Sequence, residues 1–211
     1  DVCSSDLHGS AAPLTDAELE LVYVGWLREG RIGGIRLVRG LTDRPASDEG
    51  VQNGDFGRQA VLKPFDWTYR IGAGVLTEPT VDDLDGRTPA LRVWYDGRSS
   101  APLASQLLTL DPGDYVLTGR RRLEDGELRL DWRVVCLESG QAVSQPSDGE
   151  EARPGAPWGG FSVRVSIPAQ DCTAQRLELA PRPADFRQAS TAWFTGLALT
   201  RSSLTRCSRS G

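Results

Sequence analysis

Residues 14–41 carry apolar side chains at a helical spacing. Thr15, with Glu18 three residues later, predicts a capping box at the start of a helix. One apolar face of that helix is then formed by Leu19, Val22, Tyr23, Trp26 and Leu27. Gly30 is a suitable residue to end it.

The apolar spacing continues at Ile32, Ile35, Val38 and Leu41. Two glycines, Gly33 and Gly34, weaken the helical tendency of this second set. We expect residues 14–41 to form a short helical hairpin. The motif LREGR at residues 27–31 is similar to the end of a tetratricopeptide array, which implies further helical repeats of the same protein as neighbours.

Beyond residues 42–50, whose Pro, Ser, Asp and Gly predict a linker, the apolar period changes from about 3.6 to 2. Apolar and polar side chains alternate over residues 91–96, 115–118, 128–136 and 161–167. Turn signals such as Asp111-Pro112-Gly113 separate these runs, and residues 139–160 are predicted to form a long loop. Short strands in this pattern predict a mainly β, antiparallel sandwich or barrel and not a parallel α/β sheet.

The composition narrows the function classes. The chain has 211 residues, a formal net charge of -5, one His and no apolar run of transmembrane length. An acidic chain disfavours binding to nucleic acid, and a single His disfavours His-based catalysis and His-rich metal sites. The first seven residues, DVCSSDL, match the translation of a common sequencing adapter. We expect residues 1–13 to be artefactual or disordered, any export signal to be missing, and residues 204–211 to be a disordered tail.

Five short segments carry a resemblance to a known family. They are Asn53-Gly54-Asp55-Phe56, Pro64-Phe65-Asp66-Trp67, residues 90–93, residues 106–115 and residues 192–199. In this order, residues 51–203 resemble the CenC-type carbohydrate-binding modules, including those at the C-terminus of bacterial tetratricopeptide proteins. The resemblance implies a galactose-binding-like jelly-roll β-sandwich that binds a glycan or an exopolysaccharide.

Two cysteines could form a disulfide bond. Cys136 ends one strand run and Cys172 follows the next, so we expect a bridge between them, with two buried thiols as the alternative. A bridge indicates an oxidising, extracytoplasmic location such as the periplasm or cell surface. Cys207 is expected to be free, and the spacing of the cysteines does not predict a zinc site.

Tryptophans are the candidate sugar-binding residues because aromatic rings stack on the apolar faces of pyranoses. Strand parity places Trp94 opposite Leu91 and Val93, either as an exposed platform or packed under a loop. Trp67 and Trp158 lie outside the predicted strands, where binding residues are common, although Trp67 could instead close one end of the sandwich. Trp132 and Trp193 are expected in the core.

Charged residues on the outward strand positions could bind sugar hydroxyls or uronates. They are Arg92, Arg129, Arg133 and Asp131, and the alternative is an ordinary solvated surface. For an enzyme, Asp96 and Asp131 would have to converge on one cleft, because no G-x-S-x-G or Walker A motif is present. No cofactor is expected, although Asp55 and Asp66 are candidate ligands for a structural calcium.

The sequence therefore predicts a non-catalytic module that binds a polysaccharide or another glycan. The alternative is a protein-interaction or architectural module that has kept the sandwich and lost sugar binding, because a fold alone does not determine function.

Overall fold

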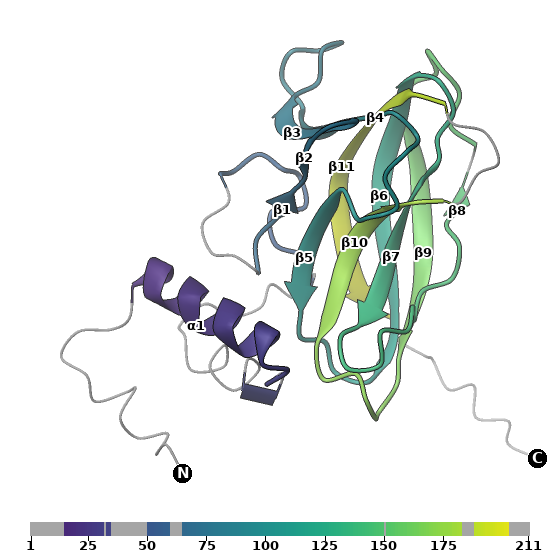
Figure 1. The fold of residues 1–211 in the computed structure, drawn as a ribbon. Helices are drawn as coiled ribbons and strands as arrows, with labels where there is room; N and C mark the ends of the chain where they lie inside the picture. Colours follow the sequence, from purple (N-terminus) through teal and green to yellow (C-terminus); the bar gives the residue numbers. More distant parts are fainter. Residues whose placement is uncertain are drawn as a thin grey trace, which may run out of the picture.

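The protein is a β-sandwich with one helix beside it, as predicted for a mainly β chain. The computed structural model describes residues 15–31, 33–34, 50–59, 65–149, 151–182 and 188–202. All strand pairs within the two sheets are antiparallel in this part of the chain. The two sheets face each other as layers (Figure 1).

The strands divide unequally between the two layers. The four-stranded sheet has the order β1 (Thr68–Tyr69), β5 (Ala104–Leu108), β10 (Gln175–Pro181) and β7 (Leu130–Cys136). The seven-stranded sheet has the order β2 (Ile71–Gly72), β3 (Val75–Val81), β4 (Pro89–Tyr95), β11 (Ser190–Arg201), β6 (Gly113–Asp125), β9 (Gly159–Ile167) and β8 (Asp148–Gly149). Strands that are consecutive in the sequence therefore often lie in different sheets.

The core fills the space between the sheets with the inward half of each alternating strand. On β4, the side chains of Leu91 and Val93 are fully buried. Trp94, which lies between Val93 and Tyr95 in the sequence, is exposed. Trp132 of β7 packs edge-on against Trp67 and Phe194, with ring centroids 5.5 and 5.7 Å apart. The period-two pattern thus predicted correctly which side chains on these strands face the core.

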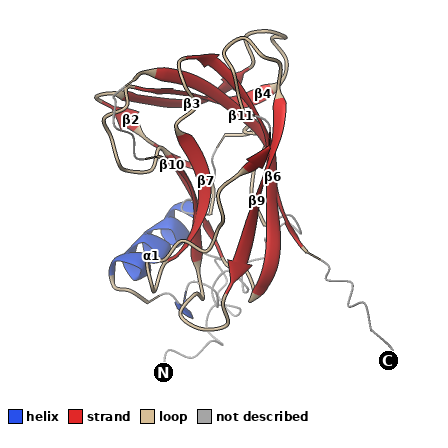
Figure 2. Ribbon diagram, turned by 90° about the vertical axis from the view of Figure 1, so that its right-hand side faces the viewer, coloured by secondary structure: helices blue, strands red, loops and turns tan. Residues whose placement is uncertain are grey.

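Helix α1 (Asp16–Arg28) begins with the predicted capping box, in which the Thr15 and Glu18 side chains each bond to the other's backbone N–H. It packs on the four-stranded sheet, on the side away from β6 and β9 (Figure 2). Its buried contacts join Leu19 and Tyr23 to Phe65 and to Leu107 of β5. Most of the predicted second helix, at residues 35–41, lies outside the described residues.

The predicted disulfide is present between Cys136 and Cys172, and both residues are buried. It joins the end of β7 to the segment that leads into β10, beside the antiparallel pairing of those strands. Cys3 and Cys207 lie outside the described residues. None of the described helices has the length and apolarity needed to cross a bilayer.

Candidate functional site

The outward side of the seven-stranded sheet combines exposed aromatic and aliphatic side chains with paired charges. Residues directly opposite each other in neighbouring antiparallel strands point to the same side of a sheet, so the strand register assigns them to one surface. We call this surface the tryptophan face. Its residues are Ile71, Leu76, Glu78, Arg92, Trp94, Arg122, Glu124, Trp158 and Trp193.

An apolar row crosses three strands of the tryptophan face. Ile71 of β2 pairs with Leu76 of β3, which pairs with Trp94 of β4. Their exposed fractions are 72%, 36% and 39%. Three neighbouring large apolar side chains that remain accessible to water are a feature of binding surfaces, whereas a single one is common on any protein surface.

A charged row runs beside the apolar row, two residues away from it along β3 and β4. Glu78 of β3 pairs with Arg92 of β4, Arg92 pairs with Trp193 of β11, and Trp193 pairs with Arg122 of β6. Trp158, just before β9, ends the row, with its ring centroid 5.8 Å from the Arg122 guanidinium carbon. From Arg92 to Trp158, guanidiniums and indoles therefore alternate across the sheet.

Arg122 is the fixed end of this charged row. Its guanidinium contacts Asp82 at 2.7 Å and Asp83 at 2.5 Å, and only 5% of its side chain is exposed. Trp158 donates its indole N–H to the second Asp82 oxygen at 2.8 Å. Because Asp82 holds both Arg122 and Trp158, the three side chains form one interlocked group.

Two carboxylates that bond to tryptophans of the face have lowered pKa values for related reasons. Burial raises the pKa of Asp82, but hydrogen bonds from Trp158 and the Leu84 N–H, with the charge of Arg122, outweigh this and hold it below its ordinary value. Burial likewise raises the pKa of Glu124, and hydrogen bonds from Trp193 and Arg92 outweigh it. Both carboxylates are therefore charged at neutral pH.

The structure confirms that Trp193 is buried, but it places the side chain on the outward side of the larger sheet. Trp193 is 2% exposed, but it lies on the tryptophan face and not among the side chains of the main core. It is covered by the guanidiniums of Arg92 and Arg122, at 5.6 and 5.0 Å from its ring centroid. Its indole N–H donates to Glu124 at 2.7 Å.

Three of the predicted ligand residues lie on the other sheet. Asp131 and Arg133 are on β7 and Arg129 directly precedes it, whereas Arg92 and Trp94 are on β4. Each of the three is paired within the protein: Arg129 with Glu127 at 2.8 Å, Asp131 with Arg182 at 3.2 Å, and Arg133 with Glu178 at 2.5 Å. The predicted residues therefore do not form one site.

Trp67 is fully buried and donates its indole N–H to the backbone oxygen of Asn53. It closes the sandwich interior, as the alternative interpretation had it, and offers no surface on which a sugar could stack. Trp158 is partly buried over Arg122 and Arg120. Of the three predicted tryptophans, Trp94 is the one whose indole the structure exposes.

The two carboxylates predicted as a catalytic pair lie on different sheets, and the two candidate calcium ligands lie in loops. Asp96 follows β4 of the seven-stranded sheet, whereas Asp131 is on β7 of the four-stranded sheet. Asp55 and Asp66 each accept a backbone N–H in their own loops, from Gly57 and Trp67. Within the described part of the chain, no group of three or more His, Cys, Asp or Glu side chains gathers as a metal site.

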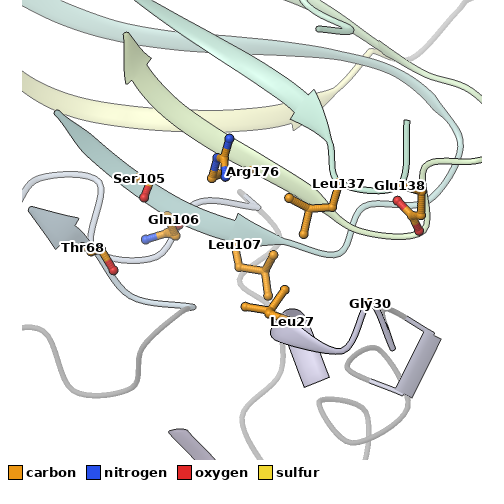
Figure 3. Close-up of a pocket in the computed structure, with 9 residues that line it drawn as sticks. All are labelled: Leu27, Gly30, Thr68, Ser105, Gln106, Leu107, Leu137, Glu138 and Arg176. Atoms are coloured by element: carbon orange, nitrogen blue, oxygen red, sulfur yellow. The ribbon is translucent and has the colours of Figure 1, made fainter. Parts of the chain in front are cut away.

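A pocket of about 640 Å³ lies on the opposite side of the molecule, between α1 and the four-stranded sheet. Leu27 of α1 and Leu107 of β5 point toward each other across it (Figure 3). Its charged side chains are already engaged, because Arg176 pairs with Glu178 at 2.6 Å and Glu138 accepts the Thr173 N–H. The pocket is therefore a gap between α1 and the sheet on which the helix packs.

Comparison with known proteins identifies the architecture. No family model matches the chain, and no curated protein matches it in sequence. A solved structure of CBM4, a carbohydrate-binding module, superposes with a TM-score of 0.53 and 14% identity, covering 72% of this chain and 99% of that one. The fold is a jelly-roll β-sandwich similar to that of this carbohydrate-binding module.

A second structure supports the same conclusion. The C-terminal family 22 carbohydrate-binding module of Clostridium thermocellum Xyn10B superposes with a TM-score of 0.50 and 15% identity, covering 75% of this chain and 98% of that module. In this jelly roll, the strands that carry Trp94, Arg92 and Trp193 are central members of the larger sheet.

Proposed function

We propose that this protein is a non-catalytic module that binds a glycan on the tryptophan face. The observation that carries the proposal is the indole of Trp94, 39% exposed in the middle of a sheet and continued by Leu76 and Ile71. The jelly-roll fold supports it, because solved carbohydrate-binding modules share this architecture.

The chemistry of a sugar ring matches the two rows of the face. A pyranose has an apolar side made of C–H groups and a rim of hydroxyls. An exposed indole stacks on the apolar side, and charged side chains at the edge bond to hydroxyls. Trp94 supplies the indole, and the partly exposed Glu78 and Arg92 on the neighbouring row supply the polar contacts.

The charges favour an uncharged glycan over an acidic one. Arg92 and Arg122 are the cations of the charged row, and each is paired with two carboxylates. An acidic polysaccharide that bound at the charged row would therefore have to displace existing ion pairs of Arg92 and Arg122. The uronate binding suggested by the many arginines is, for this reason, the weaker proposal.

We propose further that the module works outside the cytoplasm. The buried bond between Cys136 and Cys172 supports this location, because disulfides form and persist in oxidising compartments.

A glycan array carrying neutral and acidic polysaccharides tests the proposed function. We expect neutral glycans to bind the wild-type protein and Trp94→Ala to abolish their binding. Leu21→Ala is the matched control, because Leu21 is also exposed but lies on α1, away from the sandwich layer that carries the face. An array on which nothing binds would contradict the proposal and favour a protein partner for the exposed apolar row.

A further inference from the structure

The tryptophan face contains a second indole that is hidden by the protein's own side chains. Trp193 lies opposite Arg92, and Arg92 is two residues from Trp94 on the same side of β4. Two guanidiniums cover the Trp193 ring, at 5.0 Å for Arg122 and 5.6 Å for Arg92. If one of these guanidiniums moved away, the Trp193 ring would become accessible beside the exposed indole of Trp94.

The two covering arginines are held with different strength. Arg122 is 5% exposed and has two short ion pairs, at 2.7 and 2.5 Å. Arg92 is 37% exposed, and its pairs with Glu124 and Glu78 are longer, at 3.3 and 3.9 Å. Partly exposed pairs at such distances are weak because water screens them. Arg92 is therefore the cover that can move.

The covering position also leaves Arg92 incompletely satisfied. Its Nε atom is buried and has no hydrogen-bond partner among the residues that the structure describes. A buried donor without a partner has lost its bonds to water, and it regains them if the side chain swings outward. The covered state is thus opposed by one unmade hydrogen bond and supported by the contact of the guanidinium with the ring and by its hydrogen bond to Glu124.

We propose that Arg92 is a displaceable cap over Trp193, and that the glycan displaces it to stack on both Trp94 and Trp193. This proposal rests on the proposed function and deepens it, because it adds a binding residue with almost no exposed surface. Movement of Arg92 would also free Glu78 and Glu124 to accept hydrogen bonds from sugar hydroxyls.

The cap is tested without any ligand by acrylamide quenching of tryptophan fluorescence. Arg92→Ala should increase the quenchable fraction, and the increase should be absent from Arg92→Ala/Trp193→Phe relative to Trp193→Phe alone. Arg164→Ala is the control, because Arg164 is on β9 of the same sheet and, within the described residues, does not lie over an aromatic ring. Unchanged quenching in Arg92→Ala would overturn the cap.

The binding role of Trp193 is tested with the strongest neutral oligosaccharide from the array. Trp193→Leu should weaken its binding about tenfold, the loss expected for one stacking contact, in both the wild-type and Arg92→Ala backgrounds. Thermal unfolding of each variant shows whether it is folded, and Trp193→Phe, which keeps a ring, should retain most of the affinity.

The outcomes separate the two proposals. Equal affinities of the wild-type protein and a folded Trp193→Leu variant would overturn the role of Trp193 while leaving Trp94 as the binding residue. If the wild-type protein binds no glycan, the proposed function fails and the displacement by glycan fails with it. The quenching experiment still decides in that case whether Arg92 covers Trp193.

Discussion

The indole N–H of Trp67 donates a hydrogen bond of 2.9 Å to the backbone oxygen of Asn53. Asn53 also uses both atoms of its side-chain amide, since its Oδ1 accepts the Arg58 N–H and its Nδ2 donates to the Arg58 carbonyl. Its φ angle of 52° lies in the left-handed region, where Asn is among the favoured residues. One side chain therefore closes the loop that covers the buried Trp67.

Asn53→Ala should destabilise the fold by about 2–3 kcal/mol, because it removes two partly buried hydrogen bonds and places a residue without a side-chain partner at positive φ. Asn53→Gly loses the same bonds but adopts positive φ freely, so its loss should be smaller. Urea unfolding of the wild type, Asn53→Ala and Asn53→Gly measures the loss of unfolding free energy in each variant. Equal losses would show that the backbone angle makes no contribution.

Removing the disulfide should lower the free energy of unfolding by about 4 kcal/mol, the chain-entropy value for a loop of this length. The variant is Cys136→Ala with Cys172→Ala, compared with wild type in guanidinium chloride. Because both cysteines are buried, the native bond should also resist dithiothreitol until the protein unfolds. Rapid reduction of the folded protein would contradict the buried position of this bond.

The lowered pKa values of Asp82 and Glu124 predict how stability depends on pH. The ordinary pKa values of these groups, which apply in the unfolded chain, are 3.8 for Asp82 and 4.5 for Glu124. As the pH falls, each carboxylate therefore takes up a proton in the unfolded chain before it does so in the folded protein. The stability that they contribute is fully present above about pH 5.5 and is lost as the pH falls through the native pKa values.

Urea unfolding at a series of pH values from neutral to strongly acidic measures this dependence. Asp82→Asn should be less stable at neutral pH and should show a shallower decline in acid than wild type. Asp148→Asn, an exposed carboxylate on β8, is the control. Equal slopes for wild type and Asp82→Asn would show that Asp82 titrates alike in the folded and unfolded chains.

Two arginines of the charged row should differ in their contribution to stability. Arg122→Ala leaves Asp82, which is 2% exposed, without its cation, and loss of one partner from a buried pair costs about 3–5 kcal/mol. Arg92→Ala should cost no more than about 1 kcal/mol, because its pairs are partly exposed and long. Chemical denaturation of both variants tests this, and a larger loss for Arg92→Ala would reverse the assignment of fixed and movable arginine.

The sequence predicted the sandwich because alternation on strands such as β4 and β7 is a local property. Leu91, Val93, Trp132 and Val134 are buried as their parity required. Parity shows that a side chain points away from the core, but it does not show from which of the two sheets it points. For that reason the sequence predicts one site that contains both Arg92 and Arg133, whereas the two residues, although both outward, lie on different sheets.

The sequence does not predict on which side of its sheet the buried Trp193 lies, because its own strand gives no alternation to read. Ala192, Trp193 and Phe194 are all apolar, and the register of β11 against β6 shifts on both sides of this run. The ion pairs that cover the indole join residues far apart in the chain, such as Arg122 and Asp82, and no local pattern predicts them. The pairing of β11 with β4 and β6 is what reveals its position.

The central claim, that sugar binds to the tryptophan face through Trp94, is tested most directly by the indole N–H signals in a ¹H–¹⁵N correlation spectrum. The chain has six tryptophans, and each gives one such signal. On titration with a neutral oligosaccharide, the Trp94 signal should shift most and that of Trp193 should shift with it, while those of the core residues Trp67 and Trp132 stay in place. Shifts confined to backbone signals of β7 and β10, around Arg133 and Glu178, would place the site on the other sheet and contradict the account.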